Sequence, residues 1–461
     1  MIEVLWDFVS SRLGKSTAPR TQASCTKVRK MLVQFHVMGI LSLPGYHRNP
    51  VYNLLHRHLY RRFVLTMIFL FVSGMVMNPF IYSRHDESEF LLRLLESTGA
   101  LMIYTAVLVF NLHVHRVQHL TTLVETFTLH DRKVRVRCGR LENIFYYGIR
   151  SACFITMVAQ ILTISGESFS HVDHSGYTSV PYRPLPLTNV WIPLLDLSQP
   201  LCFYIAYVSL LYCMVVFYFM VSNLLTMYPI YLIYQHGQYR VLNKYLSYIG
   251  HRGTRRYIVD SGRLKYRRIQ RCYVDLWRNQ YKVVDTEGQS KEWQDRLDYS
   301  NVRQAVQFHQ KLISFQHKFN RSMGVICSPI VITWFVSTII SLFELTRLQS
   351  HHDLNKLIRV CSEFLMTMTC YFYACFASET LAQCEAKLHL TMYTCDWVHL
   401  LPRTRRAVQL FLFRTQRDGA YMTYLNGSVV MCYRQYGNVM KMAYSFVNFM
   451  NLIFNTEAKQ R

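Results

Sequence analysis

Two short segments combine His and Asp in a pattern that could hold a metal ion: His171–His174 and His351–Asp353. Imidazole nitrogens and carboxylates are common metal ligands. Histidines in short loops, however, are more often simply solvated. The chain also lacks a P-loop, a G-x-S-x-G elbow and an H-E-x-x-H helix. We therefore expect no metal, no cofactor and no enzymatic activity.

Charge inside an apolar segment offers a second kind of chemistry. Arg434 and Lys441 lie within the last apolar run, seven residues apart. This spacing puts them on one face of a helix, two turns apart. Ionisable residues are costly in a bilayer and usually face a bundle interior or a water-filled cavity. The pattern favours a helix that lines an aqueous path over side chains that snorkel to the interface.

Aromatic, methionine and a few polar residues gather toward one end of several apolar runs, and an apolar pocket with few polar groups suits a small volatile ligand. Any one of them is more often plain packing, so only the cluster suggests a pocket. The candidate ligand-binding residues are Phe90, Leu94, Ser97, Met157, Gln160, Phe203, Tyr204, Tyr207, Met366 and Thr369.

Long helices are needed to position these side chains. About 20 mostly apolar residues cross the hydrocarbon of a bilayer. Seven windows qualify: 63–82, 90–112, 144–164, 201–222, 325–345, 360–381 and 429–454. Lipid-facing backbone must satisfy its own hydrogen bonds. We predict an all-α polytopic membrane protein with seven transmembrane helices.

Basic residues indicate the orientation of these spans. Most of the 51 Lys and Arg residues fall before residue 63 or in 112–146, 223–321 and 384–421, which are alternate gaps between the apolar runs. Cytoplasmic loops collect Lys and Arg. The pattern predicts a cytoplasmic N-terminus and an extracellular C-terminus. Because the formal charge of +24 follows loop parity rather than one compact patch, we expect no nucleic-acid partner.

The chain divides into four parts. We expect a cytoplasmic N-terminal region (1–62), spans one to four (63–222), a long cytoplasmic loop (223–321) and spans five to seven (322–461). Helical apolar spacing in 228–250 and 299–321 predicts that spans four and five continue into the cytoplasm as a helical anchor. The Pro-rich segment 166–200 is predicted to form an irregular lid.

Within the long loop, residues 258–285 are basic and have apolar residues at helical spacing. Such a helix can bind calmodulin or lie on a membrane surface, although a solvated cytoplasmic helix is the simpler interpretation. Of the 13 cysteines, Cys202 and Cys361 fall near the outer ends of two spans, where a disulfide is permitted. Buried free thiols are the simpler expectation for the cysteines.

Several segments, in order along most of the chain, resemble those of the insect odorant receptors. HVMGILSLPG (36–45) is similar to their N-terminal segment, LPLTNVWIPLLD (185–196) to the segment before span four, and FHQKLISFQHKFNRSM (308–323) to the entry to span five. No single segment is specific, but their order is hard to obtain by chance.

The strongest resemblance is C-terminal. Residues 375–417 and 436–452 resemble the last two conserved runs of that family. Ser378-Glu379 departs from the usual Gly-Glu. The family-motif positions are Tyr393, Trp397, Lys441, Tyr444 and Ser445. Carried over by the register of Ser445, the pore and gate positions are Phe449, Leu452 and Ile453.

The resemblance implies a ligand-gated, non-selective cation channel of four subunits, with a pore lined by the last helix. It implies an odour-tuned subunit that assembles with the odorant co-receptor and binds a small volatile ligand in the plasma membrane of a sensory neuron. A gustatory receptor is the first alternative, although Thr423-Tyr424 is not followed by that family's Gln-Phe. A G-protein-coupled receptor would need an outside N-terminus, and a transporter would need an inverted repeat.

Overall fold

The computed structural model describes residues 27–43, 50–82, 87–126, 132–170, 190, 199–247, 249, 256–260, 263–267, 272–275, 280–283, 291–348, 354–416 and 421–460. Some predicted features lie outside these residues. They include both His/Asp segments and the predicted lid beyond residue 170, apart from Val190, Gln199 and Pro200.

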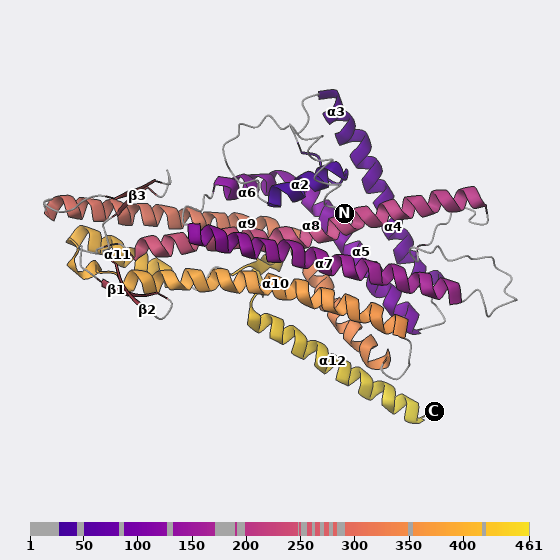
Figure 1. Ribbon diagram of the computed structural model, residues 1–461. Helices are drawn as coiled ribbons and strands as arrows, with labels where there is room; N and C mark the ends of the chain where they lie inside the picture. Colours follow the sequence, from indigo (N-terminus) through magenta and orange to yellow (C-terminus); the bar gives the residue numbers. More distant parts are fainter. Residues whose placement is uncertain are drawn as a thin grey trace.

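Six long helices form the body of the protein (Figure 1). Each contains a window long and apolar enough to cross a membrane, which confirms six of the predicted spans. These helices are α4 (Arg61–Tyr82), α5 (Glu87–Leu112), α7 (Arg132–Ser170), α8 (Pro200–Leu246), α9 (Lys291–Leu348) and α10 (Leu354–Tyr393).

The seventh candidate span, α12 (Tyr433–Gln460), is different because it is amphipathic. It is not among the described helices that meet the same apolar criterion. Val439, Ala443 and Val447 are buried on one face, and α12 contacts α9 and α10. Tyr444 and Leu452 are exposed. A helix with one buried and one exposed face in a single chain leaves the exposed face for water or another subunit.

The predicted seventh span starts too early. Its first residues, Val429–Val430, form β6, which pairs antiparallel with β5 (Thr423–Tyr424). Between them lies the 3₁₀ turn η3 (Leu425–Gly427), in which Gly427 has a φ of +96°. Asn-Gly before a strand favours such a turn, because glycine adopts positive φ without steric cost.

Two of the helices are far longer than a bilayer is thick. α8 has 47 residues and α9 has 58, so they span about 70 and 87 Å at 1.5 Å per residue. The hydrocarbon core measures about 30 Å. The predicted helical extensions of spans four and five are thus confirmed. We call the end where α8 ends and α9 begins the anchor end; η2 (Trp397–His399) and α11 (Pro402–Thr415) also lie there (Figure 1).

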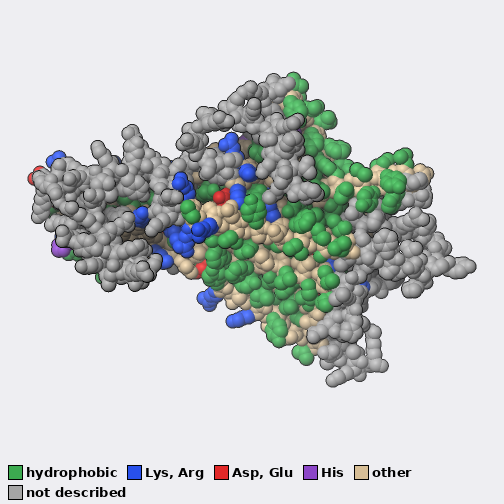
Figure 2. Space-filling model, viewed as in Figure 1, with side chains coloured by type: hydrophobic (Ala, Val, Ile, Leu, Met, Phe, Trp, Pro, Cys, Tyr) green, Lys and Arg blue, Asp and Glu red, His purple; other side chains and the backbone are tan. Residues whose placement is uncertain are grey.

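Side chains at the anchor end join the long helices. Asn243 of α8 donates from Nδ2 to the carbonyl oxygen of Cys384 on α10 (2.9 Å), and Tyr239 donates to Oε1 of Glu385 (3.5 Å). In Figure 2, hydrophobic side chains cover the part of the bundle away from the anchor end. Lys and Arg side chains gather between that hydrophobic part and the anchor end.

Shorter helices lie on one side of the bundle (Figure 1): α2 (Lys27–Val37), α3 (Pro50–Leu55), the π-helix η1 (His56–Tyr60) and α6 (Val114–Thr126). Arg150 of α7, which is buried, holds α2 to α8 by donating to Gln34 and to Asn223. Its guanidinium also lies 4.1 Å from the ring centroid of Tyr146.

The predicted helix in 258–285 is wrong. The described residues there form two antiparallel pairs, β1 (Arg256–Asp260) with β2 (Arg263–Arg267), and β3 (Cys272–Asp275) with β4 (Gln280–Val283). Tyr257 faces Tyr266 and Val259 faces Leu264 across the first pair. Aromatic and β-branched cross-strand pairs favour strands. The amphipathic helix on which a calmodulin site depended is therefore absent from the described part of this segment.

Eleven cysteines in the described part of the chain are free thiols, including Cys202 and Cys361. Most are buried, as expected of small apolar side chains. Burial raises the pKa of the Cys395 thiol, which follows α10, to about 12. This thiol is therefore protonated and unreactive at neutral pH.

Hydrogen bonds from α10 fix the start of α12. Oγ of Ser378, which is fully buried, accepts from the backbone N–H of Met422 (2.9 Å), just before β5. Oε2 of Glu379 accepts from the backbone N–H of Tyr433 (3.4 Å), the first residue of α12. A carboxylate at a helix N-terminus satisfies an otherwise unpaired donor. The Ser378-Glu379 pair thus positions the hairpin and α12 together.

We predict that Ser378→Ala destabilises the protein, because the buried N–H of Met422 loses its acceptor. An unsatisfied buried donor costs about 1–3 kcal/mol. The measurement is the thermal unfolding midpoint in detergent. Thr380→Ala is the matched control, since that hydroxyl donates to carbonyls of its own helix. Equal midpoints for both variants would contradict the assigned role of Ser378.

Candidate functional site

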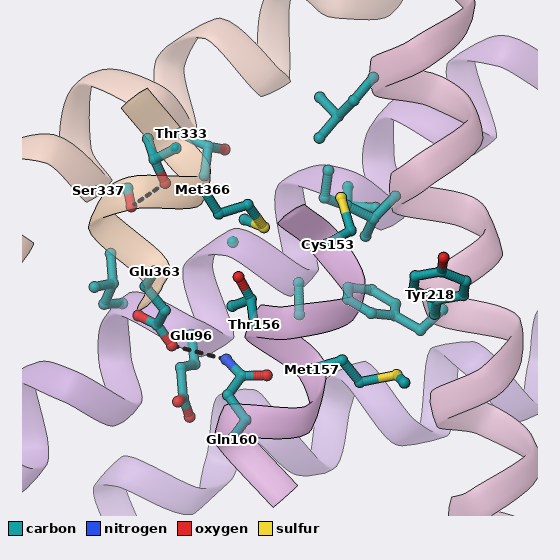
Figure 3. A pocket seen from close by; sticks show the side chains of 18 of the residues that line it. Glu96, Cys153, Thr156, Met157, Gln160, Tyr218, Thr333, Ser337, Glu363 and Met366 are labelled. Carbon is teal, nitrogen blue, oxygen red and sulfur yellow. Dashed lines mark hydrogen bonds between the residues drawn. The ribbon is translucent and has the colours of Figure 1, made fainter. Parts of the chain in front are cut away.

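A cavity of about 200 Å³ lies inside the bundle, and all six long apolar helices contribute to its wall (Figure 3). Its wall is mainly apolar. Phe71 comes from α4, Ile103 from α5, Met157 from α7, Phe217 from α8 and Trp334 from α9. The sequence suggested a pocket between spans two, three, four and six, and the wall of this cavity also includes residues of α4 and α9. Because six helices form its wall, the cavity changes shape when any one of them moves.

One part of the wall carries two carboxyl groups. Glu96 of α5 and Glu363 of α10 both line the cavity. Gln160 of α7 donates from Nε2 to Oε1 of Glu363 at 2.7 Å (Figure 3). Each of the three side chains lies nine or ten residues from the helix end opposite the anchor end, about 14 Å along its helix. They therefore lie at the same depth in the bundle.

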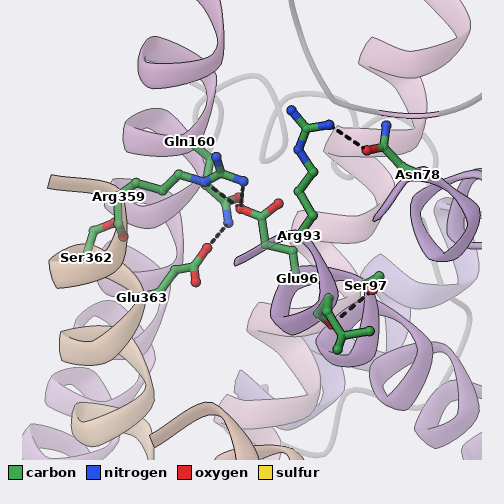
Figure 4. A network of polar contacts seen from close by, with 9 residues as sticks. Asn78, Arg93, Glu96, Ser97, Gln160, Arg359, Ser362 and Glu363 are labelled. Carbon is green, nitrogen blue, oxygen red and sulfur yellow. Dashed lines mark hydrogen bonds and ion pairs between the residues drawn. The ribbon is translucent and has the colours of Figure 1, made fainter. Parts of the chain in front are cut away.

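Glu96, Gln160 and Glu363 form what we call the polar end of the cavity, and an ion pair lies directly beside it. Arg359 of α10 has no exposed surface and donates from Nε (2.7 Å) and Nη2 to Oε1 of Glu96 (Figure 4). One turn before Glu96, Arg93 donates to Oδ1 of Asn78 at 3.0 Å. Buried charges require partners because transfer out of water is costly. The Arg359–Glu96 pair joins α5 and α10 across the end of the cavity.

Hydroxyl groups complete the polar part of the wall. Thr156 donates to the carbonyl oxygen of Ala152 (3.0 Å), and Thr333 donates to that of Pro329 (2.9 Å). Ser337 and Thr367 share a hydrogen bond of 3.3 Å between α9 and α10. These bonds keep polar groups satisfied inside an apolar bundle.

Three of the ten predicted pocket residues line the cavity: Met157, Gln160 and Met366. Leu94 and Ser97 lie on α5 next to lining residues but are not part of the wall, and Ser97 donates to the carbonyl of Leu94 (2.9 Å). Thr369 likewise lies on α10 beyond the lining residue Thr367.

The predicted aromatic residues lie elsewhere. Phe203 and Tyr207 stack on one another at the start of α8, with ring centroids 6.3 Å apart, and Tyr204 is exposed. Phe90 packs edge-on against Phe80, at 5.7 Å. None of the four lines the cavity.

The pore and motif residues predicted on the last helix share its exposed side. Lys441, Tyr444, Ser445, Phe449 and Leu452 are all exposed, and the side chain of Ile453 lies outside the described residues. Arg434 is also exposed on α12.

The other two family-motif residues lie at the anchor end. There the indole N–H of Trp397 donates to the carbonyl oxygen of Tyr393 (3.2 Å). This bond closes the turn after α10.

The sequence interpretation missed Glu96, Arg359 and Glu363. All three are ionisable residues within or beside predicted spans, which is itself a signal of function or of pairing. Their spacing of four on α10 places Arg359 and Glu363 on one helical face. The sequence prediction inferred an aqueous environment from charge within a span only for Arg434 and Lys441.

Long apolar helices packed around a mainly apolar cavity are the architecture of a multi-pass helical membrane protein. The model of the family described as 7tm odorant receptor matches residues 115–444. The chain belongs to this odorant receptor family.

Solved structures show the same fold. The insect olfactory receptor OR5 of Machilis hrabei in complex with eugenol superimposes with a TM-score of 0.69, covering 93% of this chain and 98% of that one at 10% identity. A second structure of the OR5 receptor of Machilis hrabei gives a TM-score of 0.65 at 10% identity, covering 92% of this chain and 97% of that one. Odorant receptor 85c of Drosophila melanogaster is 21% identical over 150 residues, 32% of this chain and 36% of that receptor. The match thus spans little more than a third of that relative.

We predict that Arg359→Met destabilises the protein by about 3–5 kcal/mol, because Glu96, whose side chain is only 11% exposed, is left without its cation. Removing both charges, in Arg359→Met with Glu96→Met, should recover most of this loss. The measurement is the thermal unfolding midpoint in detergent for both single variants and the double variant. Lys387→Met, an exposed cation on the same helix, serves as the control. A double variant no more stable than Arg359→Met would refute the pairing.

Proposed function

We propose that this chain is an odour-tuned subunit of a ligand-gated, non-selective cation channel, which detects volatile molecules in the sense of smell. It assembles with the odorant co-receptor in the plasma membrane of a sensory neuron, as a hetero-oligomer and most simply a tetramer. The observation that carries the proposal is the mainly apolar cavity inside the helix bundle of a chain of the odorant receptor family.

The size of the cavity supports a volatile ligand. An apolar cavity of about 150 Å³ in another protein binds benzene. The cavity here measures about 200 Å³ and therefore suits a molecule of one ring with a short substituent. The Machilis hrabei receptor, which has the same fold, is described in complex with eugenol, a small aromatic molecule.

The amphipathic last helix supports a pore. In a single chain, α12 exposes Phe449 and Leu452 together with Lys441. Four copies of such a face around an axis would line an aqueous path, and a ring of apolar side chains can gate it by excluding water. Ligand binding favours the open state to the extent that the ligand binds that state more tightly.

The family match favours this proposal over a gustatory receptor, since the matching family model is that of the odorant receptors. The proposed orientation, with an inner N-terminus and an outer C-terminus, rests on the basic segments of the sequence and on the Lys and Arg side chains near the anchor end (Figure 2). It disfavours a G-protein-coupled receptor.

We predict that Gly99→Leu weakens the response to volatile ligands. A Cβ atom at Gly99 would meet only Cγ2 of Thr333, at 3.9 Å, so a side chain here enters the cavity without disturbing the helix backbone. Filling a binding cavity costs the ligand about 1–3 kcal/mol, or about 5- to 150-fold in affinity. The measurement is odorant-evoked current in cells that express this chain with the co-receptor.

Gly139→Leu is the matched control for this substitution. A Cβ at Gly139 meets nothing within 4 Å, and the residue does not line the cavity. We expect its half-maximal concentrations to equal those of the unaltered chain. Currents unchanged by Gly99→Leu would show that the ligand binds elsewhere.

We predict that an epitope added after Arg461 labels on intact cells, whereas an N-terminal epitope labels only after permeabilisation. In the proposed topology the N-terminus is cytoplasmic and the chain crosses the membrane an odd number of times, so the C-terminus is extracellular. Antibody labelling before and after permeabilisation is the measurement. An intracellular C-terminal epitope would exclude the proposed topology and with it α12 as a helix that ends outside.

A further inference from the structure

The polar end of the cavity is rich in hydrogen-bond acceptors. The hydroxyl protons of Thr156 and Thr333 are donated to carbonyl oxygens of their own helices. Each hydroxyl oxygen then keeps only acceptor capacity for a ligand. The carboxyl groups of Glu96 and Glu363 are also acceptors when ionised. A ligand that presents a donor to this end therefore matches it better than a ligand that presents a carbonyl.

The charges at this end are also unequal. Among the described residues that line the cavity, the charged side chains are Glu96 and Glu363, both acidic. Arg359 directs Nε and Nη2 to Glu96. The hydrogen bond to Oε1 of Glu363 comes instead from the neutral amide of Gln160 (2.7 Å). Glu363 is 6% exposed, so burial disfavours its charged form unless a cation lies close to it. Arg359 is the cation for both carboxyl groups, so two acidic side chains share one basic side chain.

Because an ammonium group would stabilise the charged form of Glu363, we propose that the cavity selects small volatile amines, whose ammonium group pairs with Glu363 while the apolar body fills the remaining space. The inference rests on the proposed function, since it takes the cavity as the odorant site. An alcohol of the same shape would bind more weakly, because its hydrogen bond to the carboxylate involves one charge instead of two.

The position of Glu363 suits ligand entry. It lies nine residues from the first residue of α10, at the end of the bundle opposite the anchor. In the proposed orientation this is the outer side. Figure 4 shows Glu363, Gln160, Glu96 and Arg359 converging there from α10, α7 and α5. The remaining wall toward Phe217 and Ile103 is apolar and suits a hydrocarbon body.

A ligand series with one skeleton tests the proposal on the unaltered chain expressed with the co-receptor. The probes are 2-phenylethylamine, 2-phenylethanol and propylbenzene, each also applied to the co-receptor alone. We expect the amine to have a half-maximal concentration at least about tenfold below that of the hydrocarbon, as a charge-assisted hydrogen bond allows. Equal potency, or a more potent hydrocarbon, would overturn the proposal.

The variant Glu363→Gln tests the residue itself, because it keeps the size of the side chain and can still accept from Gln160. We expect the ratio of amine to hydrocarbon potency to fall at least about tenfold. Glu385→Gln is the matched control: it lies on the same helix, outside the cavity, 3.8 Å from Nε2 of His309, and should leave the ratio unchanged. A ratio unchanged by Glu363→Gln would also overturn the proposal. If this variant does not reach the surface, the ligand series decides.

Failure of the inference differs from failure of the proposed function. If hydrocarbons evoke currents that Gly99→Leu weakens but the amine has no advantage, the odorant site stands and amine selection is wrong. If no volatile evokes current while both chains are at the surface and a co-receptor agonist opens the channel, the proposed function is wrong and the inference falls with it.

Discussion

Arg359 has no exposed surface and donates twice to Glu96, and this pair ties α10 to α5 beside the cavity. Lipid offers no partner for polar groups, so the polar side chains of a membrane bundle must find partners across helices. Arg150 follows the same rule when it binds Gln34 and Asn223 between α2, α7 and α8. Such pairs fix which faces of nearly uniformly apolar helices point inward. The cavity lies where these inward faces do not fill the space.

Each of six spans predicted from the apolar windows of the sequence lies within one helix of the structure, because a bilayer imposes one minimum length on every spanning helix. The extensions of α8 and α9 followed from their helical spacing. The hairpins were missed because two-residue turn signals, Ser261-Gly262 and Asn426-Gly427, are short beside a long helical pattern. The odorant receptor resemblance, read from ordered segments, agrees with the family match over residues 115–444.

Seven of the ten residues that the sequence suggested for a pocket lie outside the wall of the cavity. Aromatic residues were expected to line it, but Tyr204 is 66% exposed, because a helix that is apolar all round carries no pattern to tell its lipid face from its inner face. The ionisable residues Glu96, Arg359 and Glu363 were the better guide, since lipid would reject them from the outer face. Charge inside a span locates the interior more reliably than aromatic content does.

Helix α10 connects the cavity to the last helix, α12. α10 carries Glu363 and Met366 in the cavity wall and, within two turns, the rings that pack against α12. The centroids of Tyr371 and Tyr436 are 5.4 Å apart, and those of Phe372 and Tyr433 are 6.2 Å apart. A close-packed interface of this kind is not continuously deformable, so a displacement of α10 has to be accommodated by a shift of α12. In the proposed channel, a ligand would shift α12 to the extent that it binds one position of α10 more tightly than another.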